Sequence, residues 1–270
     1  MENPKKMVTI AGSDILAGGG IQADLATFNE YGYFGLSVIT SIVTVTKDDF
    51  TIHPVPLDVL DAQLQSIFAL DEIAGVKVGL LPTVGHVHMV ADYLRRYATN
   101  MPVIIDPVMA FKETDDVDVV ELVAAFQKDL LPLASMTTPN LVEGELLAGI
   151  KIKDKADLAQ AAEIIRGFGA DAVVVKGGAR LAGNEATDVV TTGAEPTFLG
   201  SQKLDSAFNN GAGCTFASAI ASQLATGKTP VDAVKDAKDF VYWGIKNGVA
   251  LNDDFSVGNV WQAARRLRGK

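Results

Sequence analysis

A glycine-rich segment that ends in the only cysteine is the part of the sequence best suited to hold an anion. Residues Asn209 to Ser218 read Asn-Asn-Gly-Ala-Gly-Cys-Thr-Phe-Ala-Ser, and the small-residue pattern from Thr215 to Ala225 predicts a helix. The first turn of a helix leaves backbone N–H groups unpaired and carries the positive end of the helix dipole, so this start can bind a phosphate. A glycine-rich turn that only begins a packed helix is an equally good interpretation of the segment taken alone.

Polar residues also follow apolar, strand-like runs at three other places: Asp106 after Ile105, Asn140 and Glu143 after Thr138, and Lys176 after Val175. Polar residues at the carboxyl ends of strands in an open α/β sheet face the ligand crevice. A lysine is costly to bury without an anion, and carboxylates there can orient hydrated Mg²⁺ on a polyphosphate. Each has a structural alternative: loop capping for Asp106, a capping box for Asn140 with Glu143, and a surface position for Lys176.

The elements that must position these residues are predicted by alternating periodicities. Strand-like runs occupy 7–11, 37–46, 76–81, 103–108 and 172–178, and helical patterns occupy 21–28, 56–68, 86–97 and 161–168. This alternation predicts a mostly parallel sheet between helices, which is a three-layer αβα fold. A hairpin (188–192 and 197–199) and helices at 215–225, 230–247 and 257–267 complete the expectation. Because no linker or repeat divides the chain, we expect one domain spanning 1–270.

Charge and composition exclude several classes of protein. The net charge of −10 comes without a dense basic run, so nucleic acid is not an expected partner. No signal peptide or membrane-spanning apolar run is present, and the single cysteine fits a reducing compartment, so we expect a cytoplasmic protein with no membrane partner. The three histidines, His53, His86 and His88, are predicted to be surface residues rather than a zinc site.

Six short motifs occur in order along nearly the whole chain: Gly12-Ser13-Asp14, Gly20-Ile21-Gln22-Ala23-Asp24-Leu25, Ile105-Asp106-Pro107-Val108-Met109, Thr138-Pro139-Asn140-Leu141-Val142-Glu143, Lys176-Gly177-Gly178 and Gly211-Ala212-Gly213-Cys214-Thr215. Together they resemble the branch of the ribokinase-like superfamily that holds hydroxymethylpyrimidine (phosphate) kinases and bacterial pyridoxal/pyridoxine kinases. The resemblance implies an αβα fold, a homodimer, and transfer of the ATP γ-phosphate, with Mg²⁺, to a primary hydroxymethyl group on a small aromatic heterocycle.

The resemblance also implies roles for single residues. The backbone amides of Gly211, Ala212, Gly213 and Cys214 would form an anion hole for the transferring phosphoryl group. The nucleotide would be held by Asn140, Lys176, Gly178, Gly213, Asp188 and Lys238, the last two near the nucleoside, and Mg²⁺ by Asp106 and Glu143 through water. The heterocycle would contact Gly12, Ser13, Asp24, Val45 and Val108, with Asp24 binding a polar ring substituent.

Cys214 stands where sugar-kinase relatives keep an aspartate as general base. A thiol at a helix N-terminus has a reason for a lowered pKa, so we expect Cys214 to act as a base or as a nucleophile toward an aldehyde. A small buried packing residue is the alternative.

Three positions depart from the family pattern. Asn210 replaces the usual histidine before the Gly-x-Gly-Cys segment, which puts in doubt any mechanism that needs a Cys–His pair. Ile15-Leu16-Ala17 replaces the usual Pro-Ser-Gly, and Ala110 stands where some pyridoxal-handling relatives have a second cysteine.

Two local differences favour a vitamin B6 substrate. The pyrimidine kinases usually have Ala-Gln-Asn-Thr after the second strand, and here Val45 takes the place of the glutamine, so it cannot hydrogen-bond an exocyclic amine. Gly79-Leu80-Leu81-Pro82-Thr83 also resembles the B6 branch. We therefore expect a pyridoxal/pyridoxine kinase. A hydroxymethylpyrimidine or hydroxymethylpyrimidine-phosphate kinase is the alternative enzyme, and a catalytically idle B6 or nucleotide sensor is the alternative from another class.

Overall fold

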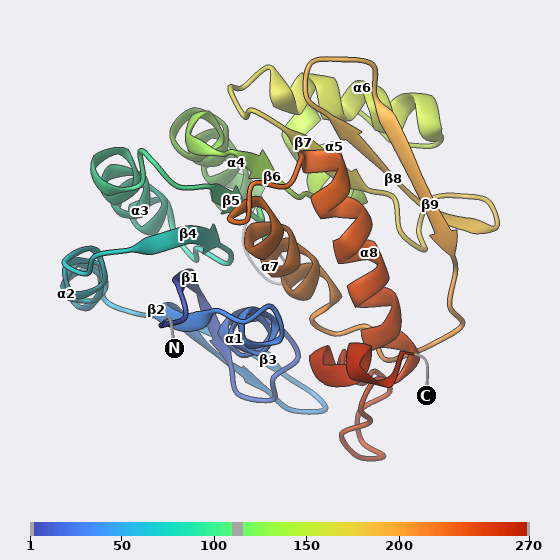
Figure 1. Ribbon diagram of the computed structural model, residues 1–270, viewed down its shortest axis with the longest axis horizontal. Helices are drawn as coiled ribbons and strands as arrows, with labels where there is room; N and C mark the ends of the chain where they lie inside the picture. Colours follow the sequence, from blue (N-terminus) through green and yellow to red (C-terminus); the bar gives the residue numbers. More distant parts are fainter. Residues whose placement is uncertain (1–2, 110–115, 269–270) are drawn as a thin grey trace.

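A single nine-stranded sheet forms the centre of the molecule in the computed structural model, which describes residues 3–109 and 116–268 (Figure 1). The strands are β1 (Lys6–Asp14), β2 (Phe34–Val45), β3 (Phe50–Pro54), β4 (Ile73–Val78), β5 (Val103–Ile105), β6 (Met136–Thr137), β7 (Val173–Lys176), β8 (Glu185–Thr191) and β9 (Thr197–Gln202). Their order across the sheet is β3-β2-β1-β4-β5-β6-β7-β8-β9.

The sheet is parallel in its middle and antiparallel at both edges. Strands β2, β1, β4, β5, β6 and β7 pair in parallel, whereas β3 pairs antiparallel with β2, and β8 and β9 add two antiparallel pairings after β7. Central parallel strands need helical crossovers, so both faces of the sheet are covered and these strands consist mainly of apolar residues. The predicted hairpin is β8–β9, and edge strand β3 lies where no strand was predicted.

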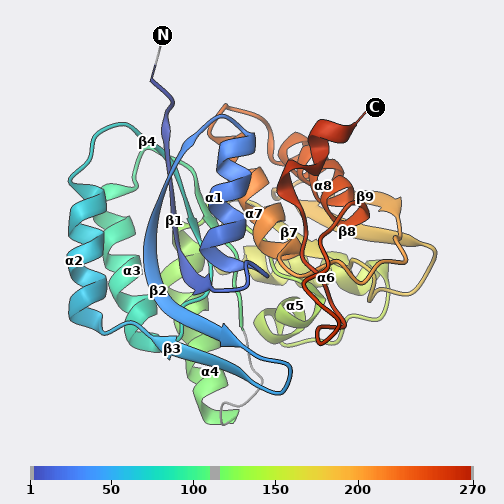
Figure 2. The ribbon, with the colours of Figure 1, turned by 90° about the horizontal axis from the view of Figure 1, so that it is seen from below.

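Eight α-helices cover the described sheet: α1 (Gly20–Glu30), α2 (Leu57–Phe68), α3 (Val84–Tyr97), α4 (Asp116–Ala125), α5 (Leu141–Ala148), α6 (Lys155–Arg166), α7 (Ala212–Leu224) and α8 (Pro230–Lys246). Helices α1, α7 and α8 lie on one face of the sheet, and α2 to α6 lie on the other (Figure 2). Each group of helices shares a buried apolar cluster with the sheet face that it covers. The three-layer αβα prediction is confirmed. Every described helix is too short or too polar to cross a bilayer.

The alternation of side chains along each strand decides which residues meet the helices. In β4, Val76 and Val78 join the cluster with α2 to α6, so Lys77 between them faces the α1 and α7 side. In β1, Val8 and Ile10 join that same cluster, so Thr9 faces α1. Strands β1 and β4 thus bring polar groups into the layer that holds α1 and α7.

The predicted helix at 257–267 is wrong over residues 257–261, and the rest is a 3₁₀ helix rather than an α-helix. A 3₁₀ turn covers only Gln262–Leu267. The backbone N–H of Asn259 donates to Val249 O, and its carbonyl accepts from Val249 N, each at 2.8 Å. The N–H of Val260 donates to Asn210 O. Because these backbone groups pair with distant segments, they are not available to a helical ladder.

Candidate functional site

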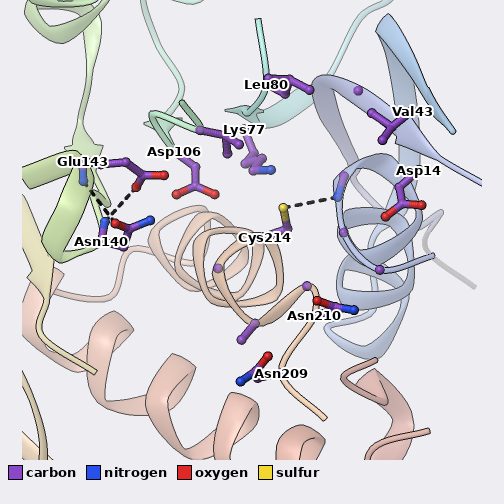
Figure 3. Close-up of a pocket in the computed structure, with 18 of the residues that line it drawn as sticks. Asp14, Val43, Lys77, Leu80, Asp106, Asn140, Glu143, Asn209, Asn210 and Cys214 are labelled. Carbon is purple, nitrogen blue, oxygen red and sulfur yellow. Dashed lines mark hydrogen bonds between the residues drawn. The ribbon is translucent and has the colours of Figure 1, made fainter. Parts of the chain in front are cut away.

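Two adjoining cavities open where the parallel strands end. The first cavity has a volume of about 320 Å³ and is lined by Gly12, Asp14, Gly18, Gly19, Gly20, Val43, Phe50, Lys77, Leu80, Asp106, Val108, Asn140, Glu143, Lys176 and residues 209–214 (Figure 3). The second, of about 420 Å³, lies toward β8, β9 and α8 and is lined in part by Gly177, Gly178, Ala186, Asp188, Ser201, Lys203, Lys238 and Tyr242. Both include Asn140, Lys176, Asn209, Ala212 and Gly213, so these five residues form the boundary between them.

The boundary includes the start of α7, as the sequence predicted. Gly211 precedes the helix with φ of +82°, a conformation that L side chains rarely adopt. The first intrahelical bond runs from Thr215 N–H to Gly211 O, and the N–H of Ala212 already donates to Asn209 O at 3.2 Å. The amides of Gly213 and Cys214 lie in the first turn, before any intrahelical acceptor, and are the better-placed donors for an anion.

The thiol of Cys214 lies between this helix start and the loop before α1. Its Sγ accepts a hydrogen bond from the N–H of Gly20 at 3.2 Å (Figure 3). Burial raises the pKa of Cys214 to about 11, and the nearby Lys77 ammonium opposes that rise. The predicted lowering of the Cys214 pKa is therefore wrong, because desolvation outweighs the favourable charge.

Asp106, Glu143 and Lys176 lie together at the carboxyl ends of the central parallel strands. The ammonium of Lys176 donates to Asp106 Oδ1 at 3.3 Å, and the Thr138 hydroxyl donates to the same oxygen at 2.8 Å. Burial raises the pKa of the Glu143 carboxyl, Lys176 opposes the rise, and Asp106 adds to it. Although burial works in the opposite direction, the two carboxylates raise the pKa of Lys176. The Lys176 ammonium therefore stays charged at the boundary between the two cavities.

The capping box predicted for Asn140 and Glu143 is present. The Asn140 side chain accepts from the amides of Val142 and Glu143, and Glu143 Oε2 accepts from the Asn140 amide at 2.8 Å. The same two side chains line the first cavity (Figure 3). The structural and the functional interpretation of this motif are thus compatible, since one carboxylate oxygen of Glu143 caps the helix while the side chain borders the cavity.

The second cavity brings together three residues predicted for the nucleotide. Lys238 on α8 donates to Asp188 Oδ2 at 2.6 Å and to the carbonyl of Ala186 at 3.1 Å. The N–H of Gly178 donates to Asp188 Oδ1 at 3.4 Å. Helix α8 and the β8 strand are far apart in the sequence, and this ion pair joins them beside the cavity.

The residues predicted for the heterocycle divide into two groups. Gly12 and Val108 line the first cavity, together with Val43 and Phe50 from β2 and β3. Ser13 and Val45 are not among the lining residues: the Ser13 hydroxyl accepts from Gln22 Nε2, and Val45 lies at the end of β2 opposite Phe50. The first cavity therefore contacts β2 at Val43, two residues before Val45, which was the predicted position.

The predicted contact between Asp24 and a ring substituent is contradicted. Asp24 is 0% exposed, lies outside the residues lining either cavity, and accepts hydrogen bonds from Thr9, Lys77 and Ser218. Sequence reasoning missed Lys77, which is one of the residues lining the first cavity. The available signal was a lysine inside the apolar run 76–81, because a lysine buried there requires a partner.

Three other residues named from the sequence have different outcomes. His86 is buried rather than on the surface: its ring nitrogens lie 2.7 Å from Thr83 Oγ1 and 2.9 Å from Val55 O. Asn210 borders the first cavity, and its backbone pairs with Gly258 and Val260. Ala110 lies outside the described residues.

No complete protein metal site is found within residues 3–109 and 116–268, because no three His, Cys, Asp or Glu side chains group suitably there. Mg²⁺ usually keeps several waters and is bound by one or two carboxylates together with substrate phosphates. Asp106 and Glu143, which line one cavity beside Lys176, fit that pattern.

Known proteins resemble the chain over nearly its whole length. Pyridoxine kinase of Bacillus subtilis is 37% identical over 97% of this chain and 97% of its own. The hydroxymethylpyrimidine/phosphomethylpyrimidine kinase of Haemophilus influenzae is 36% identical over 98% and 100%.

Solved structures resemble it equally well. An ADP complex of Bacillus subtilis pyridoxal kinase superposes with a TM-score of 0.92 at 36% identity, covering 98% of this chain and 100% of that one. Staphylococcus aureus pyridoxal kinase in complex with AMP-PCP and pyridoxal gives a TM-score of 0.90 at 37% identity, covering 98% and 95%. The ribokinase-like fold that the motifs imply is thereby confirmed. Residues 14–259 match the model of the phosphomethylpyrimidine kinase family, and the chain belongs to that family.

Proposed function

We propose that this chain is an ATP-dependent kinase that phosphorylates the 5-hydroxymethyl group of pyridoxal, pyridoxine or pyridoxamine. The observation that carries the proposal is the pair of adjoining cavities with Lys176 and the start of α7 between them. One cavity has the size and apolar wall for a single aromatic ring, and the other extends toward Lys238. The Staphylococcus aureus relative takes AMP-PCP and pyridoxal, which is the ligand pair that such cavities would hold.

The nucleotide would lie in the second cavity with its phosphates directed at the boundary. Lys176 would bind the transferring phosphoryl group, and the amides of Gly213 and Cys214 would donate to its oxygens as charge develops. Lys238 and Asp188 would contact the nucleoside side of the ligand. When bound by Asp106 and Glu143 through water, Mg²⁺ would neutralise charge on the phosphates.

The acceptor would lie in the first cavity with its hydroxymethyl oxygen toward α7. Attack of that oxygen on the γ-phosphorus releases ADP and requires loss of the hydroxyl proton. Cys214, in its thiolate form, is our candidate to accept this proton, and Lys77 and Asp106 lie beside it in the same cavity (Figure 3). Closure of the cavity around a ring would exclude water from the phosphoryl group and limit hydrolysis of ATP.

The choice of a B6 vitamer rests on the wall that β2 and β3 provide. Val43 and Phe50 line the cavity there, and neither side chain can hydrogen-bond an exocyclic amine. The name of the matching family and the Haemophilus influenzae relative favour the alternative, a kinase for hydroxymethylpyrimidine or its phosphate. A substrate that already carries a phosphate would need additional cations.

The test measures ATP consumption with Mg²⁺ against pyridoxal, pyridoxine, pyridoxamine and hydroxymethylpyrimidine, with product masses recorded. We expect the B6 vitamers to gain one phosphate at least about tenfold faster than the pyrimidine, which corresponds to the loss of one polar contact. Faster reaction of the pyrimidine, or addition of two phosphates to it, would identify a thiamine-pathway kinase. Tight ATP binding without turnover would support the sensor alternative, and removal of Mg²⁺ with EDTA should abolish turnover.

We further propose that residues 1–270 act as one kinase domain, in the cytoplasm, and that two copies form a homodimer. These proposals rest on the resemblance to the bacterial kinases and on the single sheet that runs through the chain. Sedimentation velocity at several protein concentrations tests the dimer, which predicts a species of twice the chain mass.

A further inference from the structure

A fully buried ion pair lies beneath the first cavity. Lys77 and Asp24 are both 0% exposed, and the ammonium donates to Asp24 Oδ2 at 2.9 Å. The Thr9 hydroxyl donates to the same carboxylate oxygen at 2.6 Å. Removing two charges from water costs several kcal/mol per ion, and a pair of apolar residues would fill the space without that cost. The pair therefore calls for a reason other than stability.

The pair is attached to the helix that carries Cys214. The Ser218 hydroxyl on α7 donates to Asp24 Oδ1 at 2.7 Å. Ser218 follows Cys214 by four residues, so both side chains lie on the same face of α7, one turn apart. Asp24 thus fixes the ammonium of Lys77 against the side of α7 that presents the thiol.

Lys77 reaches toward the cavity from this position. An ammonium has three N–H donors, and Asp24 accepts one of them. Lys77 is among the residues that line the first cavity, together with Cys214 and Asp106, and Figure 3 shows the three side chains converging there. Gly79 leaves the room for it, since a Cβ on that residue would lie 2.8 Å from Nζ.

We propose that Lys77 is a positioning residue for Cys214: its buried ammonium, held in place by Asp24, supplies the positive charge that stabilises the thiolate at the start of α7. Four charged groups act on the thiol. Lys77 from β4 favours its ionisation, and Asp24 from α1 and Asp106 after β5 oppose it. Lys176 from β7 also interacts with the thiol, because negative charge on Cys214 raises the pKa of the Lys176 ammonium. The Lys77 contribution is the largest of the charge effects on Cys214.

The test measures the rate of Cys214 alkylation by iodoacetamide between about pH 7 and about pH 10, without nucleotide or acceptor. Cys214 is the only cysteine, so incorporated mass reports this residue alone. Because thiolate is the reactive form, the Lys77→Met variant should react about tenfold more slowly than the wild type at a given pH, as for a one-unit rise in pKa. Asp24→Asn removes the opposing charge and should react about threefold faster.

Opposite changes separate an electrostatic role from a structural one. If the pair only held the elements together, both substitutions would loosen the cavity and speed alkylation. Changes in the same direction, or no change in either variant, would overturn the proposal. The double variant Lys77→Met/Asp24→Leu replaces the pair by apolar residues, which buried pairs often tolerate. If Lys77→Met does not fold, the double variant decides: it should react more slowly than the wild type, because the Lys77 effect exceeds that of Asp24.

The catalytic meaning of this arrangement rests on the proposed kinase function, but the measurement does not. Alkylation is followed without substrates, and ATP turnover by the wild type is measured separately. Opposite rate changes in a protein that phosphorylates no heterocycle would support the role of Lys77 and refute the kinase. Kinase activity with unchanged alkylation rates in both variants would support the kinase and refute the role of Lys77.

Discussion

Among the described residues, Lys176 is the one cationic side chain that lines both cavities. Its ammonium contacts Asp106, lies 5.6 Å from the centre of the Phe216 ring, and borders the start of α7. Lys238 is a matched comparison, because it is also a nearly buried lysine paired with an aspartate, but it borders only the second cavity. In the proposed arrangement the two lysines would differ mainly in their distance from the transferring phosphoryl group.

Replacing Lys176 should affect the chemical step. We expect Lys176→Met to lower kcat by about a hundredfold, as for the loss of one donor to a developing charge. Lys238→Met should raise the KM for ATP by about tenfold with little change in kcat, because it would remove binding common to ground and transition state. Steady-state kinetics with ATP and pyridoxal measures both. The assignment fails if the two variants show the same division between kcat and KM.

At the scale of elements, the carboxyl ends of β5, β6 and β7 place Asp106, Asn140 and Lys176 side by side. The isolated bridge between Asn140 and Lys176 extends the parallel pairing of β6 and β7 beyond the strands. The first turn of α5 then holds Glu143 through the capping box. The ends of the elements, rather than their middles, thus form the site.

Loss of the Asn140 cap should combine a stability effect with a kinetic one. Asn140→Ala should lower the free energy of unfolding by about 1 kcal/mol, the usual effect of losing an N-cap, and should raise the KM for ATP. Urea denaturation and steady-state kinetics are the measurements.

The control is Asp154→Ala, which removes the N-cap of α6 away from both cavities. It should produce a similar loss of stability, about 1 kcal/mol, with unchanged kinetics. Equal kinetic effects in the two variants would show that Asn140 acts only through helix stability.

At the scale of the whole molecule, the buried His86 links α3 to the segment after β3. Burial lowers its pKa from 6.5, and the hydrogen bond to Val55 opposes the change. The unfolded state therefore binds more protons below about pH 6.5, and the free energy of unfolding must fall as pH falls through that range. The neutral ring contributes its full stability only above the pKa of the unfolded state.

Replacing His86 should remove this part of the pH dependence. The stability difference between the wild type and His86→Gln should shrink as pH falls from about 7 to about 5, as followed by urea denaturation. The exposed His53→Gln serves as the control, since that ring is largely in solvent. A difference that stays constant or grows toward low pH would contradict the prediction.

Ligand binding gives a second prediction for the whole molecule. A nucleotide that binds only the folded state at 100 times its Kd should raise the free energy of unfolding by about 2.7 kcal/mol. We expect ADP to produce this stabilisation and Lys238→Met to reduce it, as measured by urea denaturation at fixed ADP. Equal stabilisation of the wild type and the variant would remove Lys238 from the nucleotide site.

Local patterns determined the layers of the fold and most of the boundary between the cavities. Apolar runs bounded by glycine and proline predict β1, β2, β4, β5 and β7, because strand and helix periodicities are properties of neighbouring residues. The strand ends then indicate Asp106, Asn140, Glu143 and Lys176. The start of α7 follows from small residues ahead of a helix. These features depend on short stretches of sequence.

Only the tertiary structure decided what depends on distant residues. Asp24 has the appearance of a helix-start acid, yet it is buried because Lys77 and Ser218 lie opposite it. The pKa of Cys214 is raised because the layers packed around the thiol desolvate it, an effect that no local motif encodes. The segment around Asn259 is extended because its backbone pairs with Val249. Burial and long-range pairing sum over the whole molecule, so the sequence determined which groups are present and the fold decided their charge and their partners.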